Sequence, residues 1–238
     1  MHFSKRIGRF ALDRRVIGVL LLAALVLAAR GWLIANPQHN PWAPLNLSDP
    51  PGWATRQKLA GLRDDPAECR AVLERSDVAF TALDPVGDGA CRREDRTQLS
   101  QTPLQPNVAG TCAVMAGFEL WLDRSVETAA QDIFGSPVSG IEHFGTYSCR
   151  RLYGRDSGPW SEHATGNAID IASFLLEDGS RISVLEDWPS GSPESEFLHR
   201  VRDGACEIFG TVLSPDYNAA HRDHFHFDQA GRGFGACR

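Results

Sequence analysis

The chain has 238 residues, 42% hydrophobic and 23% charged, a composition typical of a globular protein with a buried core. Its formal charge of −6 is uneven: six basic residues and one aspartate precede residue 36, which gives that part +5 and leaves −11 for the rest. A folded region this acidic lacks the basic surface that nucleic-acid binding requires. The composition therefore predicts one acidic domain behind a basic N-terminus and excludes a nucleic-acid partner.

Residues 1–35 have the pattern of an export segment. Residues 5–15 are basic, and residues 16–35 are apolar apart from one arginine. A charged start before an apolar run is typical of an export signal, and about 20 residues can span a bilayer. We favour an uncleaved anchor in the inner membrane, with Trp32 near its outer interface and the rest of the chain in the periplasm. The alternative is a signal cleaved near residues 26–28, which would release the exported part.

A proline-rich segment follows. Residues 36–52 contain five prolines, which suits an extended tether that lies along a surface or lifts the next domain off the membrane. No internal repeat or low-complexity tract follows it. We therefore expect residues 53–238 to form a single domain.

Hydrophobic periodicity predicts the helices of this domain. Apolar residues recur at every fourth position between residues 111 and 134, which predicts a long helix with one face on the core. Residues 65–75, with a proline in the first turn, and residues 195–209 are also expected to be helical. Three large aromatic side chains are expected to pack in the core: Phe118, Trp121 and Trp188.

Strand patterns lie between these helices. Strands are expected at residues 78–83, 167–176, 181–185 and 223–228, and a strand or hairpin is expected at residues 138–150. Residues 153–160 and 214–218 are rich in turn-forming residues and are expected to be loops. Strands that return around long helices predict an α+β fold, with a mainly antiparallel sheet flanked by helices.

The six cysteines are widely spaced and include no Cys-x-x-Cys pair, which argues against a zinc ribbon or a thioredoxin-type motif. An even number in an exported chain predicts three disulfides, and buried free thiols are the alternative. The pairing that we favour joins neighbours along the chain: Cys69 with Cys91, Cys112 with Cys149, and Cys206 with Cys237.

Histidines alternate with phenylalanines near the C-terminus, in residues 223–228. Alternate side chains of a strand share a face, so His224 and His226 are expected to point one way and the phenylalanines into the core. The two imidazoles would lie about 7 Å apart at the backbone. At that spacing both reach one metal ion, or one binds it and the other serves its water.

A second polar stretch, residues 161–170, supplies His163 in a loop and Asp170 on a buried strand. An unpaired buried carboxylate is costly, so Asp170 needs a metal or a hydrogen-bond donor. One carboxylate and two histidines are a ligand set that leaves a fourth position for water, whose pKa zinc lowers to about 7. The bland alternatives are that His163 is an ordinary surface histidine and that His221, outside the alternation, is simply solvated.

Five segments of the chain carry a family resemblance: Pro41-Trp-x-Pro44, Tyr147-Ser-Cys-Arg-Arg151, Ser161-Glu-His-Ala-Thr-Gly-Asn-Ala-Ile-Asp170, Leu213-Ser-Pro-Asp-Tyr-Asn-Ala-Ala-His221 and Asp223-His-Phe-His226. Together, over about residues 40–238, they are similar to the bacterial extensin-like C-terminal domain family. That family in turn resembles the zinc peptidases grouped around lysostaphin, the D-Ala-D-Ala carboxypeptidases and Sonic hedgehog, including the penicillin-insensitive murein endopeptidases.

The resemblance also implies a separate role for each of these side chains. It implies that Zn²⁺ is held by His163, Asp170 and His226. It implies that His224 is the general base or a transition-state donor, and that Arg150 stabilises the oxyanion or holds a substrate carboxylate. Two further candidates are His221, for catalysis or substrate contact, and Ser161, for substrate binding. Unlike the carboxypeptidase branch, this chain has no glutamate as base before its last ligand.

The resulting hypothesis is a periplasmic, membrane-tethered zinc peptidase with a hedgehog-like core that hydrolyses amide bonds in peptidoglycan peptides, as an endopeptidase or a carboxypeptidase. Two rivals remain at this stage. One is a non-catalytic cell-wall-binding or scaffold protein with a structural zinc site, because structural sites use the same ligand types. The other is a zinc hydrolase that acts on a different amide or ester.

Overall fold

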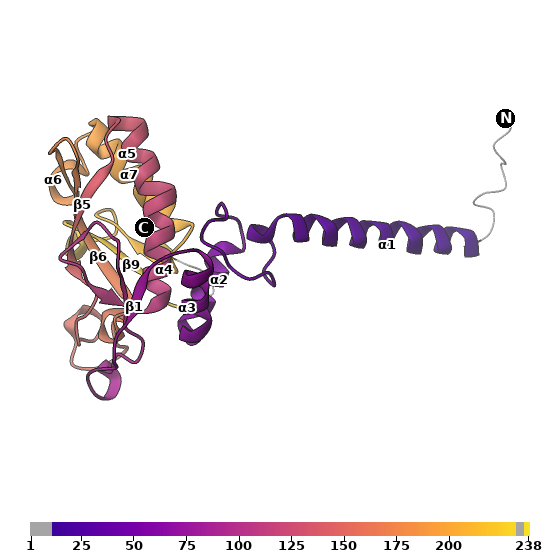
Figure 1. The fold of residues 1–238 in the computed structure, drawn as a ribbon, viewed down its shortest axis with the longest axis horizontal. Coiled ribbons are helices and arrows are strands. Elements are labelled where there is room, and N and C mark those ends of the chain that lie inside the picture. The colour runs from indigo at the N-terminus through magenta and orange to yellow at the C-terminus, as the bar shows by residue number, and fades with distance from the viewer. Residues whose placement is uncertain (1–10, 232–235) are drawn as a thin grey trace.

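The computed structural model describes residues 11–231 and 236–238 (Figure 1). The first element, α1 (Ala11–Ala35), projects away from the folded domain as a single helix. Its 23 residues from Asp13 to Ala35 are long and apolar enough to cross a membrane, and the most apolar stretch is not buried against the protein. A signal sequence has the same properties, so length and composition support export without deciding whether α1 is retained.

The proline-rich segment lies along the surface of the domain, one of the two arrangements expected for it. It begins with a short 3₁₀ turn, Pro37–His39, and its Leu45 and Leu47 are buried in the core. The Leu47 amide donates to Ser76 Oγ at 2.9 Å. Apolar burial and backbone hydrogen bonding therefore hold residues 45–47 on the domain surface.

Two short helices follow, α2 (Thr55–Gly61) and α3 (Pro66–Arg75), joined by a 3₁₀ turn at Leu62–Asp64. Asp65 caps α3 by accepting a hydrogen bond from the Glu68 amide at 3.0 Å, and proline occupies the first turn. Both features satisfy or avoid the unpaired amides at a helix start. The predicted helix at residues 65–75 is confirmed.

The long predicted helix is also confirmed, with one irregularity. It consists of α4 (Cys112–Trp121), a π-helical turn (Leu122–Val126) and α5 (Glu127–Phe134). The last long helix, α7 (Pro193–Cys206), begins two residues before its predicted start and ends three residues before its predicted end.

The domain is α+β, as predicted. The strands of its main sheet lie in the order β10-β8-β9-β6-β5-β3, with β7 paired to β6, and most neighbours are antiparallel. The pairs β3–β5 and β8–β10 are parallel. The bounds are β3 Leu104–Gln105, β5 Val138–Gly145, β6 Ala168–Leu176, β7 Arg181–Ser183, β8 Thr211–Leu213, β9 Phe225–Asp228 and β10 Ala236–Cys237.

A smaller antiparallel sheet is formed by β1 (Phe80–Ala82), β2 (Thr97–Leu99) and β4 (Ala109–Gly110). All five predicted strands are shorter than expected. Strand β1 covers only Phe80–Ala82 of residues 78–83, β5 ends at Gly145 instead of residue 150, and β6 begins one residue late, at Ala168. The strand predicted at residues 181–185 ends at Ser183, because the Ser183 side chain caps α6 (Val184–Asp187). The strand predicted at residues 223–228 begins only at Phe225.

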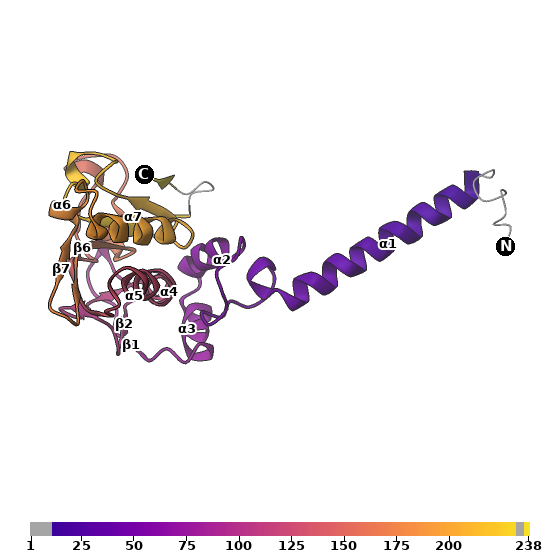
Figure 2. The ribbon, with the colours of Figure 1, turned by 90° about the horizontal axis from the view of Figure 1, so that it is seen from above.

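The helices α4, α5 and α7 pack together on the core side of the main sheet (Figure 2). Trp121 of α4 contacts Phe227 of β9 and Phe174 of β6, with ring centroids 5.0 and 6.0 Å apart. Its indole nitrogen donates to the Val201 carbonyl at 2.8 Å, which satisfies a buried polar group. Phe118, Trp121 and Trp188 are buried, which confirms their predicted place in the core.

All six cysteines form disulfides, but two of the three expected pairings are wrong. Cys206 pairs with Cys237 as predicted. The other bonds join Cys69 with Cys112 and Cys91 with Cys149. The physical reason is tertiary: α3 packs on α4, which brings the cysteines of these two helices together, and Cys91 is left to pair with Cys149.

Candidate metal centre

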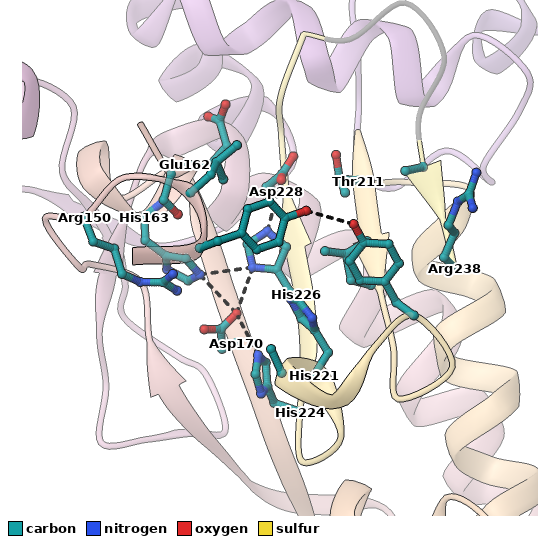
Figure 3. Close-up of a pocket in the computed structure, with 17 residues that line it drawn as sticks. Arg150, Glu162, His163, Asp170, Thr211, His221, His224, His226, Asp228 and Arg238 are labelled. Atoms are coloured by element: carbon teal, nitrogen blue, oxygen red, sulfur yellow. Dashed lines mark hydrogen bonds and ion pairs between the residues drawn. The ribbon is translucent and has the colours of Figure 1, made fainter. Parts of the chain in front are cut away.

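The main sheet brings two of the predicted ligands side by side. Strands β6 and β9 pair so that Asp170 lies opposite His226. On β9, Phe225 and Phe227 are fully buried against the helices, while His226 faces the other side of the sheet. The predicted alternation is therefore confirmed, and it places the polar side chains in a cavity (Figure 3).

His163 reaches the same cavity from a 3₁₀ turn, Glu162–Thr165, that precedes β6. Ser161 caps this turn by accepting a hydrogen bond from the His163 amide at 3.3 Å. Gly166 ends it with φ +77°, a left-handed conformation that favours glycine. The turn then leads directly into β6, which sets the distance between His163 and Asp170.

A buried polar network fixes this turn against α4. Asn167 accepts from the Thr111 hydroxyl at 2.9 Å and donates to Glu162 Oε2 at 2.7 Å. Arg63 adds an ion pair to the same Glu162 oxygen at 3.3 Å. The carboxylate of Glu162 is therefore occupied by structural contacts, although it lines the cavity.

The three predicted ligands converge within hydrogen-bond distance of one another. His163 Nε2 lies 3.1 Å from Asp170 Oδ1 and 3.1 Å from His226 Nδ1, and His226 Nδ1 lies 2.9 Å from Asp170 Oδ1. Among the described residues, these three form the group of histidine and carboxylate atoms that could hold a metal ion. All three side chains are buried.

Outer contacts decide which imidazole atoms carry hydrogen. His163 Nδ1 lies 3.1 Å from the Thr146 carbonyl, which can only accept, so Nδ1 carries the hydrogen and Nε2 has a lone pair. His226 Nε2 donates to Asp228 Oδ2 at 3.1 Å in the same way. When both imidazoles are neutral, they therefore point two lone pairs, with that of Asp170, at one spot, an arrangement that suits a cation at its centre.

The donor set fits zinc. Two imidazole nitrogens and one carboxylate oxygen are among the ligands of catalytic zinc sites. Tetrahedral ligands about 2.1 Å from zinc lie about 3.4 Å apart, and the separations of 2.9–3.1 Å between these ligand atoms are a few tenths of an ångström shorter than that edge. The three ligands line an open cavity, so the fourth side of the cluster faces space that a water molecule or substrate can reach.

Without a metal, a proton supplies the positive charge. Burial lowers the pKa of His226, but hydrogen bonds to Asp170 and Asp228 outweigh burial and raise it to about 9. Burial raises the pKa of Asp170, but contacts with His163 and His226 hold it well below its usual range. The metal-free cluster therefore holds His226 as an imidazolium between two carboxylates at neutral pH.

His224 lies beside the cluster without joining it. Its Nε2 is 3.8 Å from Asp170 Oδ1, and its Nδ1 contacts Asp223 Oδ1 at 2.9 Å. An exposed ring, Phe144, packs edge-on against it with centroids 5.5 Å apart. This position beside a ligand, with a carboxylate behind the ring, suits a general base.

His221 and Arg150 complete the polar wall of the cavity. Burial and, to a lesser extent, His224 and His226 together lower the pKa of His221 to about 4, so this imidazole is neutral near pH 7. Its Nδ1 contacts Asn218 Oδ1 at 2.9 Å. Arg150 is fixed through its backbone, whose carbonyl accepts from the Ser161 amide at 3.0 Å.

Sequence reasoning assigned no role to several residues of this site. Asp228 was detectable, because it continues the alternation of His224 and His226 along one face. Tyr153 and Tyr217 gave no such signal, because two separate loops bring their hydroxyls 3.1 Å apart at the cavity wall. Thr211 and Arg238 also line the cavity and lie on the short strand β8 and just after β10.

The fold and the site define a class: an α+β domain that carries a buried His-Asp-His cluster on the open side of a mainly antiparallel sheet. The sequence model described as "Extensin-like protein C-terminus" matches residues 67–238, and the chain belongs to this family. No curated protein and no solved structure matches the chain.

Proposed function

We propose that this chain is an exported zinc peptidase that hydrolyses amide bonds in peptidoglycan peptides. The observation that carries the proposal is the convergence of three lone pairs, on His163, Asp170 and His226, at the wall of an open cavity. The cavity volume of about 450 Å³ is within the range of small-molecule and cofactor sites. It is large enough for a few residues of a peptide.

In this proposal His163, Asp170 and His226 hold Zn²⁺, which supplies Lewis-acid activation of water and of the scissile carbonyl. His224 accepts the proton of the attacking water and later delivers a proton to the leaving amine. Its contact with Asp223 orients the ring. Arg150 donates to the oxygen on which negative charge develops.

The neutral state of His221 suits a supporting role. With a pKa of about 4 it adds no positive charge beside the cluster at neutral pH. A neutral imidazole can donate one hydrogen bond and accept another. We assign it to contact with the peptide amide that flanks the scissile bond.

The proposed location is the periplasm, with α1 retained in the inner membrane. The apolar helix supports export, and the three disulfides are typical of an oxidising compartment. Peptidoglycan is the polymer that a domain tethered there would meet.

The test is to incubate the full-length chain, in detergent, with purified muropeptides, with and without a chelator, and to analyse the products by mass spectrometry. We expect cleavage at an amide bond, its loss on chelation, its return with Zn²⁺, and its absence in His226→Ala. Absence of any zinc-dependent product from wild type would reject the peptidase. Zinc bound at full stoichiometry without hydrolysis would favour the structural-zinc scaffold instead.

A further inference from the structure

The cavity has a second polar region, away from the metal cluster. The cluster and Arg150 lie on one side, and Thr211 and Arg238 lie on the other (Figure 3). The roles proposed above use the first side alone. The second side contains a guanidinium and a hydroxyl for which the proposed reaction has no use.

The sheet register places Arg238 in line with the metal ligands. His226 pairs with Asp170 on one side and with Leu213 on the other. Arg238 donates its amide to the Val212 carbonyl at 3.0 Å and accepts at its carbonyl from the Ser214 amide at 2.7 Å, so it lies beside Leu213. Two strand spacings of about 4.8 Å put the Arg238 backbone about 10 Å from that of His226, the length of about three extended residues.

The covalent structure holds this position. Strand β10 pairs in parallel with β8, with Ala236 opposite Thr211 and Cys237 opposite Val212. Cys237 forms a disulfide with Cys206 at the end of α7. Because side chains alternate along an extended segment, a disulfide on one side of the sheet leaves Ala236 and Arg238 on the cavity side, and both line it.

Both polar groups lack partners in the described part of the chain. The Arg238 guanidinium makes no hydrogen bond or ion pair with a described residue. Thr211 is 4% exposed, and its buried Oγ1 has no hydrogen-bond partner among residues 11–231 and 236–238. A buried hydroxyl left unpaired is costly. A ligand that accepts from both groups would remove that cost.

The acidic groups of the cavity are already engaged and do not fill this position. Glu162 is paired with Arg63 and Asn167. Asp228 accepts from His226 with one oxygen and from the Ala230 amide at 2.8 Å with the other. Among the residues that line this side of the cavity and are described by the structure, Arg238 is therefore the charged group that is open to a ligand anion.

We propose that Arg238 and Thr211 form a carboxylate subsite, which binds a carboxylate of the peptide within about three residues of the scissile amide. The guanidinium offers two parallel N–H donors that match a carboxylate, and the hydroxyl offers a third. This inference rests on the proposed peptidase function and narrows its substrate class to acidic peptides. The carboxylate is either the C-terminal one or that of an internal glutamate.

Binding, measured apart from hydrolysis, tests the subsite. The probes are four acetylated pentapeptides that end in D-Ala-D-Ala and differ only in whether the C-terminal carboxyl and one internal glutamate carboxyl are free or amidated. Each is titrated by calorimetry into zinc-loaded full-length protein in detergent, with His224→Ala in the background to slow turnover. We expect amidation of one of the two carboxyls to weaken binding about tenfold or more, and the carboxyl that matters identifies the source.

Two variants assign the preference to these residues. Arg238→Gln should abolish the discrimination between free and amidated peptide, while Arg200→Gln, an exposed α7 arginine paired with Asp132, should keep it. Thr211→Val should reduce the discrimination and leave the melting temperature of the unliganded protein unchanged or slightly higher, because the lost hydroxyl has no described partner.

Equal binding of all four peptides, no binding at all, or unchanged discrimination in Arg238→Gln would overturn the subsite. Hydrolysis is scored separately on wild type. Carboxylate-dependent binding without zinc-dependent cleavage would reject the peptidase and keep the subsite. Cleavage that is indifferent to both carboxyls would reject the subsite alone.

Discussion

Strand β9 has two faces with opposite physical roles. Phe225 and Phe227 are fully buried among aromatic rings of the core. One residue along, His226 and Asp228 are nearly as buried but are held by hydrogen bonds on the cavity side. Burial therefore stabilises the fold on one face, where dispersion and the hydrophobic effect act, and concentrates charge on the other. Substitutions of adjacent residues should separate stability from chemistry.

The largest effect is expected from a ligand. His226→Gln keeps a side chain that can hydrogen-bond to Asp170 and Asp228 but lacks the imidazole lone pair. We expect the zinc content to fall below a tenth of wild type and zinc-dependent hydrolysis to fall on the order of 10³-fold or more. Elemental analysis after dialysis measures the zinc content, and a muropeptide assay measures hydrolysis. Full zinc occupancy in this variant would remove His226 from the ligand set.

The adjacent residue gives the opposite result. Phe227 packs on Trp121 and Phe209, with centroids 5.0 and 4.9 Å apart. Phe227→Ala should lower the free energy of unfolding by about 3–5 kcal/mol, measured by urea denaturation followed by circular dichroism in the presence of chelator. The protein that stays folded should still bind one zinc ion. Loss of zinc without loss of stability would contradict the division between the two faces.

A smaller effect is expected from Asp228, which hydrogen-bonds to the ligand His226. Asp228→Asn removes the negative acceptor of the His226 Nε2 hydrogen bond and should weaken zinc affinity about 10- to 100-fold. The matched control is Asp223→Asn, because Asp223 contacts His224 and not a ligand. That control should lower kcat and leave zinc affinity near wild type. Equal zinc affinity in both variants would deny Asp228 its orienting role.

The raised pKa of His226 predicts a pH dependence of zinc affinity. Zinc must displace the proton that His226 holds up to a pKa of about 9, so apparent affinity should rise about tenfold per pH unit between pH 7 and 9. The stability of the metal-free protein should depend on pH in the opposite direction. Because the pKa of His226 rises on folding from 6.5 to about 9, its protonation increases the free energy of unfolding. That contribution is complete below pH 6.5 and is lost as the pH rises through 9.

Competition with a chelator of known affinity measures the pH dependence of zinc affinity. Thermal unfolding in chelator from pH 6 to 9.5 measures the pH dependence of stability in the metal-free protein. Asp228→Asn should flatten both curves, since one of the two carboxylates that raise the pKa is lost. Zinc affinity that is constant from pH 7 to 9 would show that His226 is already neutral in the metal-free chain.

Periodic patterns allowed the strongest sequence predictions. The spacing of apolar residues located the helix at residues 112–134 within one residue, because one of its faces must meet the core. The start signal at Asp65-Pro66 located the helix at residues 66–75 equally well. The alternation in β9 correctly placed His226 on the face away from Phe225 and Phe227. Both signals are local consequences of helix and strand geometry.

Features set by tertiary packing were not predicted. The cysteine pairing depends on α3 lying against α4, which no local pattern reports. Strands β8 and β10 have three and two residues, too few for a period, so Thr211 and Arg238 gave no signal of reaching the cavity. The ligand set itself was implied by family resemblance, since spacing alone left His224 and His226 equivalent.

The smallest effect concerns Ser161, predicted from sequence to bind substrate. It caps the turn that holds His163, as Ser192 caps α7 by accepting from the Ser195 amide at 3.4 Å. Ser161→Ala and Ser192→Ala should each cost about 1 kcal/mol of stability. If the hydroxyl of Ser161 also contacts the peptide, Ser161→Ala raises KM several-fold and Ser192→Ala does not. A fall in zinc affinity with unchanged KM would instead limit Ser161 to positioning His163, which tests whether the ligand-bearing turn also contributes to substrate binding.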